Sequence, residues 1–131
     1  MSAYKSIDLH KKKSDVLVIH CSDPRFQDAY HFEVERIDRY HDLLVVPGAS
    51  KAVTDNPSIA DYVKLLHELH HFNEVHILDH IDCGAFGPVA DEIKAHSVSL
   101  KSASEKLKKS IPGIKVETYL LGQDDKVLAS T

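Results

Sequence analysis

The sequence predicts an α/β fold of three layers, in which helices cover both faces of a mainly parallel sheet. Short apolar runs alternate with segments whose apolar residues recur at helical spacing, and no internal repeat or low-complexity linker interrupts them. A length of 131 residues with 43% hydrophobic residues suits one core. We therefore expect a single domain over residues 1–131, in which residues 1–14 form a short N-terminal arm.

Four strands are predicted from runs rich in β-branched and aliphatic residues. They are expected at Asp15–His20, Leu43–Val46, Val75–Leu78 and Lys115–Leu121. The first three are short and nearly all apolar, which is typical of parallel strands buried on both faces. A turn over residues 122–125 permits a short final strand, Lys126–Ala129, that folds back antiparallel.

Three helices are predicted between these strands. The first carries Phe26, Tyr30, Val34 and Ile37 at helical spacing. The second has Asn56 as its N-cap and Pro57 in its first turn, and it carries Ile59, Tyr62, Val63, Leu66 and Leu69. The third is expected to start near Pro88, to end before Pro112 and to present one apolar stripe. That stripe consists of Val89, Ile93, His96, Leu100, Ala103 and Leu107.

Charge and hydropathy exclude several classes of function. The net charge is −4 and the basic residues are scattered, so no nucleic-acid partner is expected. No apolar run approaches the roughly 18 residues that span a bilayer, and the N-terminus lacks the apolar stretch of a signal peptide. We therefore expect a cytoplasmic protein without a membrane partner, in which cysteines indicate a metal or catalysis more often than a disulfide.

The two cysteines of the chain lie where apolar strands give way to polar turns. Cys21 follows the first predicted strand, and His80 and Cys83 follow the third. Two thiols and an imidazole are ligands that zinc prefers, with Asp23 or a water as the fourth. A strand order of 2-1-3-4 would place both ends at one ligand-binding edge, although periodicity alone leaves that order open.

These residues resemble the β-class carbonic anhydrases. The resemblance rests on Cys-x-Asp-x-Arg after the first strand and His-x-Asp-Cys-Gly after the third, and it runs from about Val16 to about Ala129. It implies a sheet of order 2-1-3-4 with an antiparallel final strand. It also implies Zn²⁺ bound by Cys21, His80 and Cys83, an Asp23-Arg25 pair beside the metal, and a closed state in which Asp23 becomes the fourth ligand.

The residue types suit zinc-dependent, reversible hydration of carbon dioxide to bicarbonate. A site with three protein ligands keeps a position for water, whose pKa falls toward about 7 and which then attacks carbon dioxide as zinc-bound hydroxide. Asp23, held by Arg25, could accept the hydrogen bond of that hydroxide. Two alternatives stay open: hydrolysis of carbonyl sulfide or carbon disulfide at the same site, and a non-catalytic zinc-binding or bicarbonate-sensing domain.

The chain departs from the pattern of the family at several positions. Only about fourteen residues precede the first strand, Pro47 to Ser50 replaces an Arg-Asn-Ala-Gly segment, Pro24 interrupts the first motif, and Asp79 stands where glycine is common. A homodimer or higher homo-oligomer is still expected, because one short chain has few segments to cover the site. Its surface would include Leu43–Val46 and residues such as Phe26 and Tyr30, although burial within the monomer is an equally simple fate for these two aromatic residues.

A second zinc pattern, His-Glu-x-x-His, runs from His67 to His71 on the second predicted helix. It falls in the last turn and lacks an obvious third ligand, which favours a polar flank of a core helix. His70 is in line with apolar residues and is expected to pack, and His76 is expected to be a hydrogen-bonded histidine of the core or sheet edge.

Overall fold

A computed structural model describes residues 7–9, 13–124 and 127–130. Its five strands are β1 (Val16–His20), β2 (His41–Val45), β3 (Glu74–His80), β4 (Lys115–Leu121) and β5 (Val127–Ser130). Its helices are α1 (Gln27–Ile37), α2 (Ser50–Asp55), α3 (Pro57–His70) and α4 (Glu92–Ser110), with the short 3-10 turns η1 (Pro24–Phe26) and η2 (Gly84–Phe86). Of the expected N-terminal arm, residues 1–6 and 10–12 lie outside the described residues.

The strands form one sheet in the order β2-β1-β3-β4-β5. β2, β1, β3 and β4 are parallel, which confirms the predicted order 2-1-3-4. In the register, His20 at the end of β1 lies opposite Leu78 of β3. β5 pairs with β4 in the antiparallel direction, and the predicted start of this strand, Lys126, lies outside the described residues.

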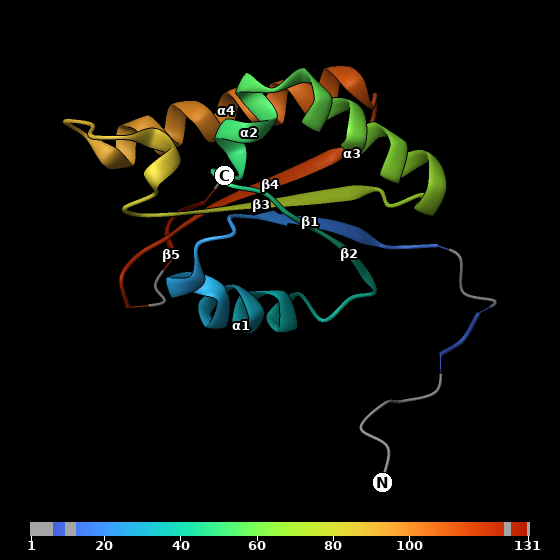
Figure 1. Cartoon of the computed structure of the whole chain (residues 1–131). Helices are drawn as coiled ribbons and strands as arrows, with labels where there is room; N and C mark the ends of the chain where they lie inside the picture. The colour runs from blue at the N-terminus through green and yellow to red at the C-terminus, as the bar shows by residue number, and fades with distance from the viewer. Residues whose placement is uncertain (1–6, 10–12, 125–126, 131) are drawn as a thin grey trace, which may run out of the picture.

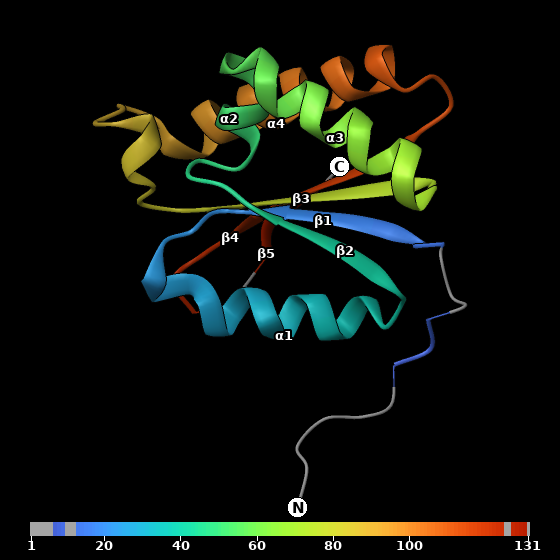
Figure 2. The same cartoon turned by 45° about the vertical axis from the view of Figure 1, so that its right-hand side comes forward.

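Helices cover both faces of the sheet. α1 lies under one face, while α2, α3 and α4 lie together over the other (Figures 1 and 2). The hydrophobic core beneath α2, α3 and α4 contains Leu17, Ile19, Val75, Ile77, Leu100 and Leu107. The core beneath α1 includes both thiols, together with Val18, Tyr30, Val34, Leu78 and Leu121. The α1 face is therefore the side of the sheet on which the predicted metal ligands pack.

The prediction that the first three strands are buried on both faces is wrong for β2. β2 is an edge strand that pairs with β1 alone, and alternate residues along it are exposed. Leu43 is 51% exposed and Val45 is 42% exposed. The apolar run of β2 therefore reflects the preference of its residues for strands, and it does not indicate burial on both faces.

The third predicted helix begins later than expected. α4 starts at Glu92, because the side chain of Asp91 caps it by accepting a hydrogen bond from the Lys94 amide at 3.1 Å. Val89 lies before the helix, and both Val89 and Ile93 are exposed. The stripe therefore packs only from His96 onward. The predicted cap of α3 is confirmed, since Asn56 Oδ1 accepts from the Ser58 amide at 3.0 Å.

Within the part of the chain that the structure describes, no helix is long and apolar enough to cross a membrane.

Candidate metal centre

The carboxyl ends of β1 and β3 bring the three predicted metal ligands together. Cys21 directly follows β1, His80 is the last residue of β3, and Cys83 lies three residues further on. Because the two strands are parallel neighbours, their ends meet at one edge of the sheet. The ligand atoms of the three residues lie within 4.8 Å of one another, and all three residues are buried.

The imidazole of His80 is oriented for a ligand at Nε2. Its Nδ1 lies 2.6 Å from the Ile81 carbonyl oxygen, so Nδ1 carries the proton and donates. Nε2 is then a free lone pair, and it is buried without a hydrogen-bond partner among the described residues. Burial lowers the pKa of His80, which favours the neutral ring that a metal requires. Phe26 stacks on this ring at 4.2 Å between centroids.

The two thiols share a buried pocket with few protein donors. The Gly48 amide donates to Cys21 Sγ at 3.4 Å. Burial raises the pKa of Cys83, and the neighbouring Cys21 raises it further. A cation between the sulfurs would reverse this effect, since metal coordination deprotonates a thiol outright. Two thiols and an unpartnered imidazole nitrogen therefore fit a soft divalent metal such as zinc.

Asp23 and Arg25 form the predicted pair beside these residues. Arg25 Nη2 donates to Asp23 Oδ2 at 2.7 Å, and Nε lies 3.1 Å from Asp23 Oδ1. Hydrogen bonds from Arg25 lower the pKa of Asp23 to about 2, so its carboxylate is ionised at neutral pH. Asp23 Oδ2 lies 3.8 Å from Nε2 of His80. The pair thus sets a fixed negative oxygen next to the free lone pair.

Local sequence explains why Asp23 occupies this position. Asp23 caps η1 by accepting from the Arg25 amide at 2.9 Å, and Pro24 stands at the first position of that turn, where its missing N–H is not needed. Gln27 Nε2 donates to the carbonyl oxygens of Cys21 at 3.1 Å and Asp23 at 2.6 Å. Pro24 therefore favours the start of η1, the turn that places Asp23 and Arg25 side by side.

Sequence reasoning assigned no role to Asp82, although it lies within the second motif. Arg25 Nη1 donates to its carboxylate and Arg25 Nη2 donates to its carbonyl oxygen, both at 2.9 Å. Asp82 has a φ of 54°, a left-handed conformation that aspartate tolerates better than most residues. In the sequence, the only sign of this role was an aspartate between His80 and Cys83.

A cavity of about 450 Å³ opens onto this centre. Its lining includes Cys21, Asp23, Arg25 and Cys83, and also Pro47, Gly48 and Ala85. The Pro47 to Ser50 segment, which departs from the pattern of the family, therefore forms part of the mouth. A small substrate has open access to the residues of the candidate centre.

The His-Glu-x-x-His pattern does not form a comparable group. His67 packs edge-on against Phe72, and His71 follows the helix in a left-handed conformation. His70 does not pack in the core as predicted, because its Nδ1 lies 2.9 Å from Asp42 Oδ1 and its side chain is 43% exposed. Across the described residues, Cys21, His80 and Cys83 are the one set of three or more metal-binding side chains that converge.

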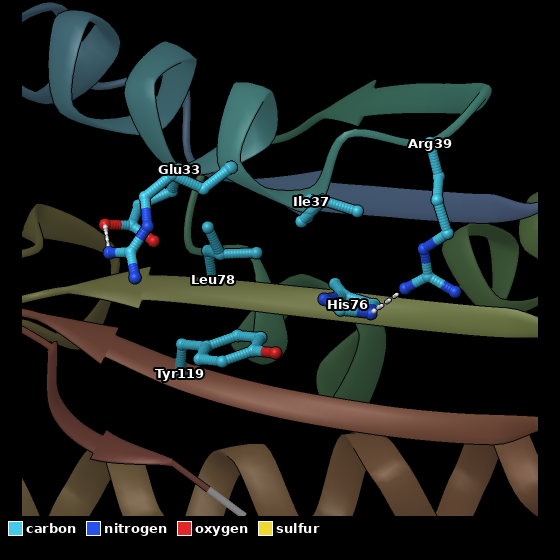
Figure 3. Close-up of a pocket in the computed structure, with 7 residues that line it drawn as sticks. Glu33, Ile37, Arg39, His76, Leu78 and Tyr119 are labelled. Atoms are coloured by element: carbon cyan, nitrogen blue, oxygen red, sulfur yellow. Dashed lines mark hydrogen bonds and ion pairs between the residues drawn. The ribbon is translucent and has the colours of Figure 1, made fainter.

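His76 lies in a separate polar group on the α1 face. Its Nε2 is 2.5 Å from Glu74 Oε2, and Arg39 Nη2 donates to the same carboxylate. Figure 3 shows His76 and Arg39 beside a pocket, together with Ile37, Leu78 and Tyr119, which also line it. The volume of this pocket is about 260 Å³. The interpretation of His76 as a hydrogen-bonded buried histidine is confirmed. Its ring hydrogen-bonds to Glu74 and stacks on Tyr119, neither of which is a predicted metal ligand.

A protein-family model described as "Putative carbonic anhydrase" matches residues 11–129. This chain belongs to that family. An uncharacterised protein of Rickettsia conorii is 29% identical over 88% of this chain and 71% of its own length. Another uncharacterised protein, from Rickettsia bellii, is 28% identical over 86% of this chain and 79% of its own length.

Solved carbonic anhydrases share the fold. A carbonic anhydrase from Streptococcus mutans has a TM-score of 0.69 and 17% identity, covering 95% of this chain and 86% of its own. The β-carbonic anhydrase isoform I of Trichomonas vaginalis has a TM-score of 0.66 and 16% identity, covering 96% of this chain and 87% of its own. The chain is therefore a divergent, carbonic-anhydrase-like member with a Cys-His-Cys group that could hold a metal.

Proposed function

We propose that this protein is a zinc-dependent lyase that reversibly hydrates carbon dioxide to bicarbonate. The observation that carries the proposal is the buried, unpartnered Nε2 of His80, which lies among two thiols and 3.8 Å from the ionised Asp23 carboxylate. An orphaned polar nitrogen in a protein interior calls for a partner, and here the surrounding donor set is one that zinc prefers. Membership of the family supports the same activity.

Cys21, His80 and Cys83 would hold the metal, with Asp23 as a fourth ligand in a closed state. Bound zinc would supply Lewis acidity, which makes water nucleophilic near neutral pH. The Ile81 carbonyl fixes the His80 tautomer, and the stacked Phe26 ring restricts the rotation of the imidazole. These contacts hold the nitrogen in position before any ligand arrives.

Asp23 and Arg25 would position the reacting water. The ionised Asp23 carboxylate, which lies at the adjoining cavity, would accept a hydrogen bond from that water and so orient it toward carbon dioxide. Arg25 holds Asp23 in this role through its bidentate contact. While it is so held, the carboxylate is retained as a hydrogen-bond acceptor rather than released to act as a ligand.

The decisive experiment combines metal analysis with stopped-flow carbon dioxide hydration on the purified protein. We expect about one zinc per chain and hydration that zinc-free protein lacks. Zinc binding without hydration, but with release of sulfide from carbonyl sulfide or carbon disulfide, would move the assignment to that hydrolase. Zinc binding with neither activity would favour the non-catalytic zinc-binding or bicarbonate-sensing domain.

We also propose that the protein is a homodimer. The edge of β2 supports this, because Leu43 and Val45 are exposed apolar residues beside unpaired backbone groups. Phe26 is partly buried and remains available, whereas Tyr30 is fully buried against His20, the alternative fate expected for these aromatic residues. Sedimentation equilibrium at micromolar concentration is the test. A monomer that hydrates carbon dioxide efficiently would contradict the proposal.

A further inference from the structure

The carboxylate of Asp79 is a buried junction between three elements. Asp79 is the residue before His80 on β3, and it is 1% exposed. Its Oδ1 accepts from the Ser50 amide at 3.0 Å, and its Oδ2 accepts from Ser50 Oγ at 2.5 Å and from His96 Nδ1 at 2.8 Å. Ser50 and His96 are completely buried as well. One side chain thus joins the end of β3 to the start of α2 and to α4.

The direction of each hydrogen bond in this group follows from the donors available. The single proton of Ser50 Oγ goes to Asp79, so Ser99 Oγ must donate to Ser50 Oγ across 2.8 Å. His96 donates from Nδ1, and its Nε2 has no hydrogen-bond partner among the described residues, with Glu92 Oε1 at 3.9 Å. Every donor in the group therefore converges, directly or through Ser50, on one carboxylate.

Through Ser50, this junction fixes the backbone that touches Cys21. The Gly48 amide, two residues before Ser50, donates to Cys21 Sγ at 3.4 Å. Between them Ala49 has a φ of 44°, and Gly48 itself has a φ of 85°. A non-glycine residue in this region is held there by its surroundings rather than by its own preference. The two hydrogen bonds from Ser50 to Asp79 supply that restraint.

Through His96, the same junction reaches the segment that follows Cys83. The His96 ring packs against Phe86 with centroids 4.0 Å apart. Phe86 is the last residue of η2, and its amide donates to the Cys83 carbonyl oxygen at 3.1 Å. The junction therefore braces the chain beside both thiols, although among the described residues it makes no hydrogen bond to either sulfur.

We propose that Asp79, Ser50 and His96 are positioning residues that set the geometry of the two thiols and so raise the metal affinity of the centre. The inference rests on the proposed metal centre, but not on the substrate. An amide N–H aimed at sulfur stabilises the thiolate that a metal binds, so a displaced Gly48 should weaken binding. Outer residues that orient metal ligands typically contribute 10- to 100-fold in affinity.

Ser50→Ala is the sharpest test, because it removes the hydroxyl and leaves the Ser50 amide and the chain intact. We expect the zinc Kd, measured by chelator competition, to rise about tenfold and the thiolate-to-metal absorption band of the cobalt-substituted protein to shift. Asp79→Asn should have a larger effect in the same direction. Ser97→Ala, an exposed serine on α4, is the matched control and should change neither quantity.

The two proposals fail in distinguishable ways. Wild-type zinc affinity and an unchanged cobalt spectrum in Ser50→Ala and Asp79→Asn, even with a lower unfolding midpoint, would reduce the junction to a structural role and overturn the inference. Tight zinc binding that weakens in Ser50→Ala, in a protein that does not hydrate carbon dioxide, would support the inference while the proposed activity fails. If Asp79→Asn does not fold, Ser50→Ala decides alone.

Discussion

Arg25 binds Asp82 twice, through Nη1 to the carboxylate and through Nη2 to the carbonyl oxygen, both at 2.9 Å. Arg25 lies in the motif after β1, and Asp82 lies in the motif after β3. The guanidinium therefore ties together the two segments that carry the candidate metal ligands, while its Nε and Nη2 hold Asp23. Arg25 is thus placed to control what Asp23 can contact.

Replacement of Arg25 should separate metal binding from activity. Arg25→Ala is expected to keep zinc and to lower carbon dioxide hydration by about a hundredfold, because Asp23 is released and its carboxylate can take the fourth ligand position. Zinc-edge spectroscopy should then show a carboxylate oxygen ligand. Arg36→Ala, an exposed arginine of α1 that pairs with Glu33, is the control. Unchanged hydration in Arg25→Ala would mean that the Asp23-Arg25 pair is structural.

Loss of one thiol should remove most of the metal. Cys83→Ser is close to isosteric and should fold, but it leaves one thiolate and one imidazole, too few soft ligands for tight zinc binding. Elemental analysis of the purified variant measures the effect. His67→Ala serves as the comparison, and its zinc content should match the wild type, since His67 packs against Phe72. Full zinc in Cys83→Ser would remove the basis of the assignment.

Gly48 should tolerate no side chain. A Cβ added there would lie 2.8 Å from the Ala85 Cβ, and the φ of 85° is unfavourable for any other residue. We expect Gly48→Ala to lower the free energy of unfolding by about 2–4 kcal/mol. Gly113 has a φ of 88° but open space around it, so Gly113→Ala should cost about 1 kcal/mol. Equal losses in the two variants, measured by urea titration, would argue against the clash.

The polar group around Glu74 should make stability depend on acid pH. Burial raises the pKa of Glu74, but hydrogen bonds from Arg39 and His76 outweigh it and lower the pKa to about 2, from an ordinary value of 4.5. A carboxyl whose pKa is lower in the folded state contributes stability above about pH 4.5 and loses it as the pH falls toward 2.

Arg39→Gln tests this contribution. Arg39 is partly exposed, so solvent screening should limit the loss in unfolding free energy at pH 7 to about 1 kcal/mol. The difference between variant and wild type should shrink in urea titrations at successively lower pH, as Glu74 becomes protonated. Arg36→Gln should show little of either effect. Most of this shrinkage should fall between about pH 3.5 and pH 2, close to the pKa of Glu74 in the folded protein. A difference that stays constant down to about pH 2 would contradict the assigned cause.

The arrangement of the metal ligands could be predicted from sequence because it follows from the sheet. Cys21, His80 and Cys83 each lie at the end of an apolar run, and parallel strands bring such ends to one edge. The roles of Asp79 and Asp82 could not be predicted in this way. Asp79 acts on Ser50 and His96, which are distant in sequence, and Asp82 depends on a left-handed turn that its neighbours do not specify.

Helix boundaries show the limit of periodicity. α2 spans six residues, Ser50–Asp55, too few for a helical period to emerge, and no helix was predicted there. The apolar stripe that starts at Val89 suggested an early start for α4, whereas the cap at Asp91 sets the true one. The capping hydrogen bond of Asp91 thus marks the start of α4, and Val89 and Ile93 remain exposed.

β1 and β3 are neighbours in the sheet, with His20 opposite Leu78, and backbone hydrogen bonds make this pairing. Formation of the sheet therefore already includes the loss of conformational entropy that brings Cys21 close to His80. Metal binding to such a preformed set requires little chain ordering, in contrast to small zinc domains that fold only around their ion. The metal-free protein should keep its sheet, and zinc should be able to leave and return without global unfolding.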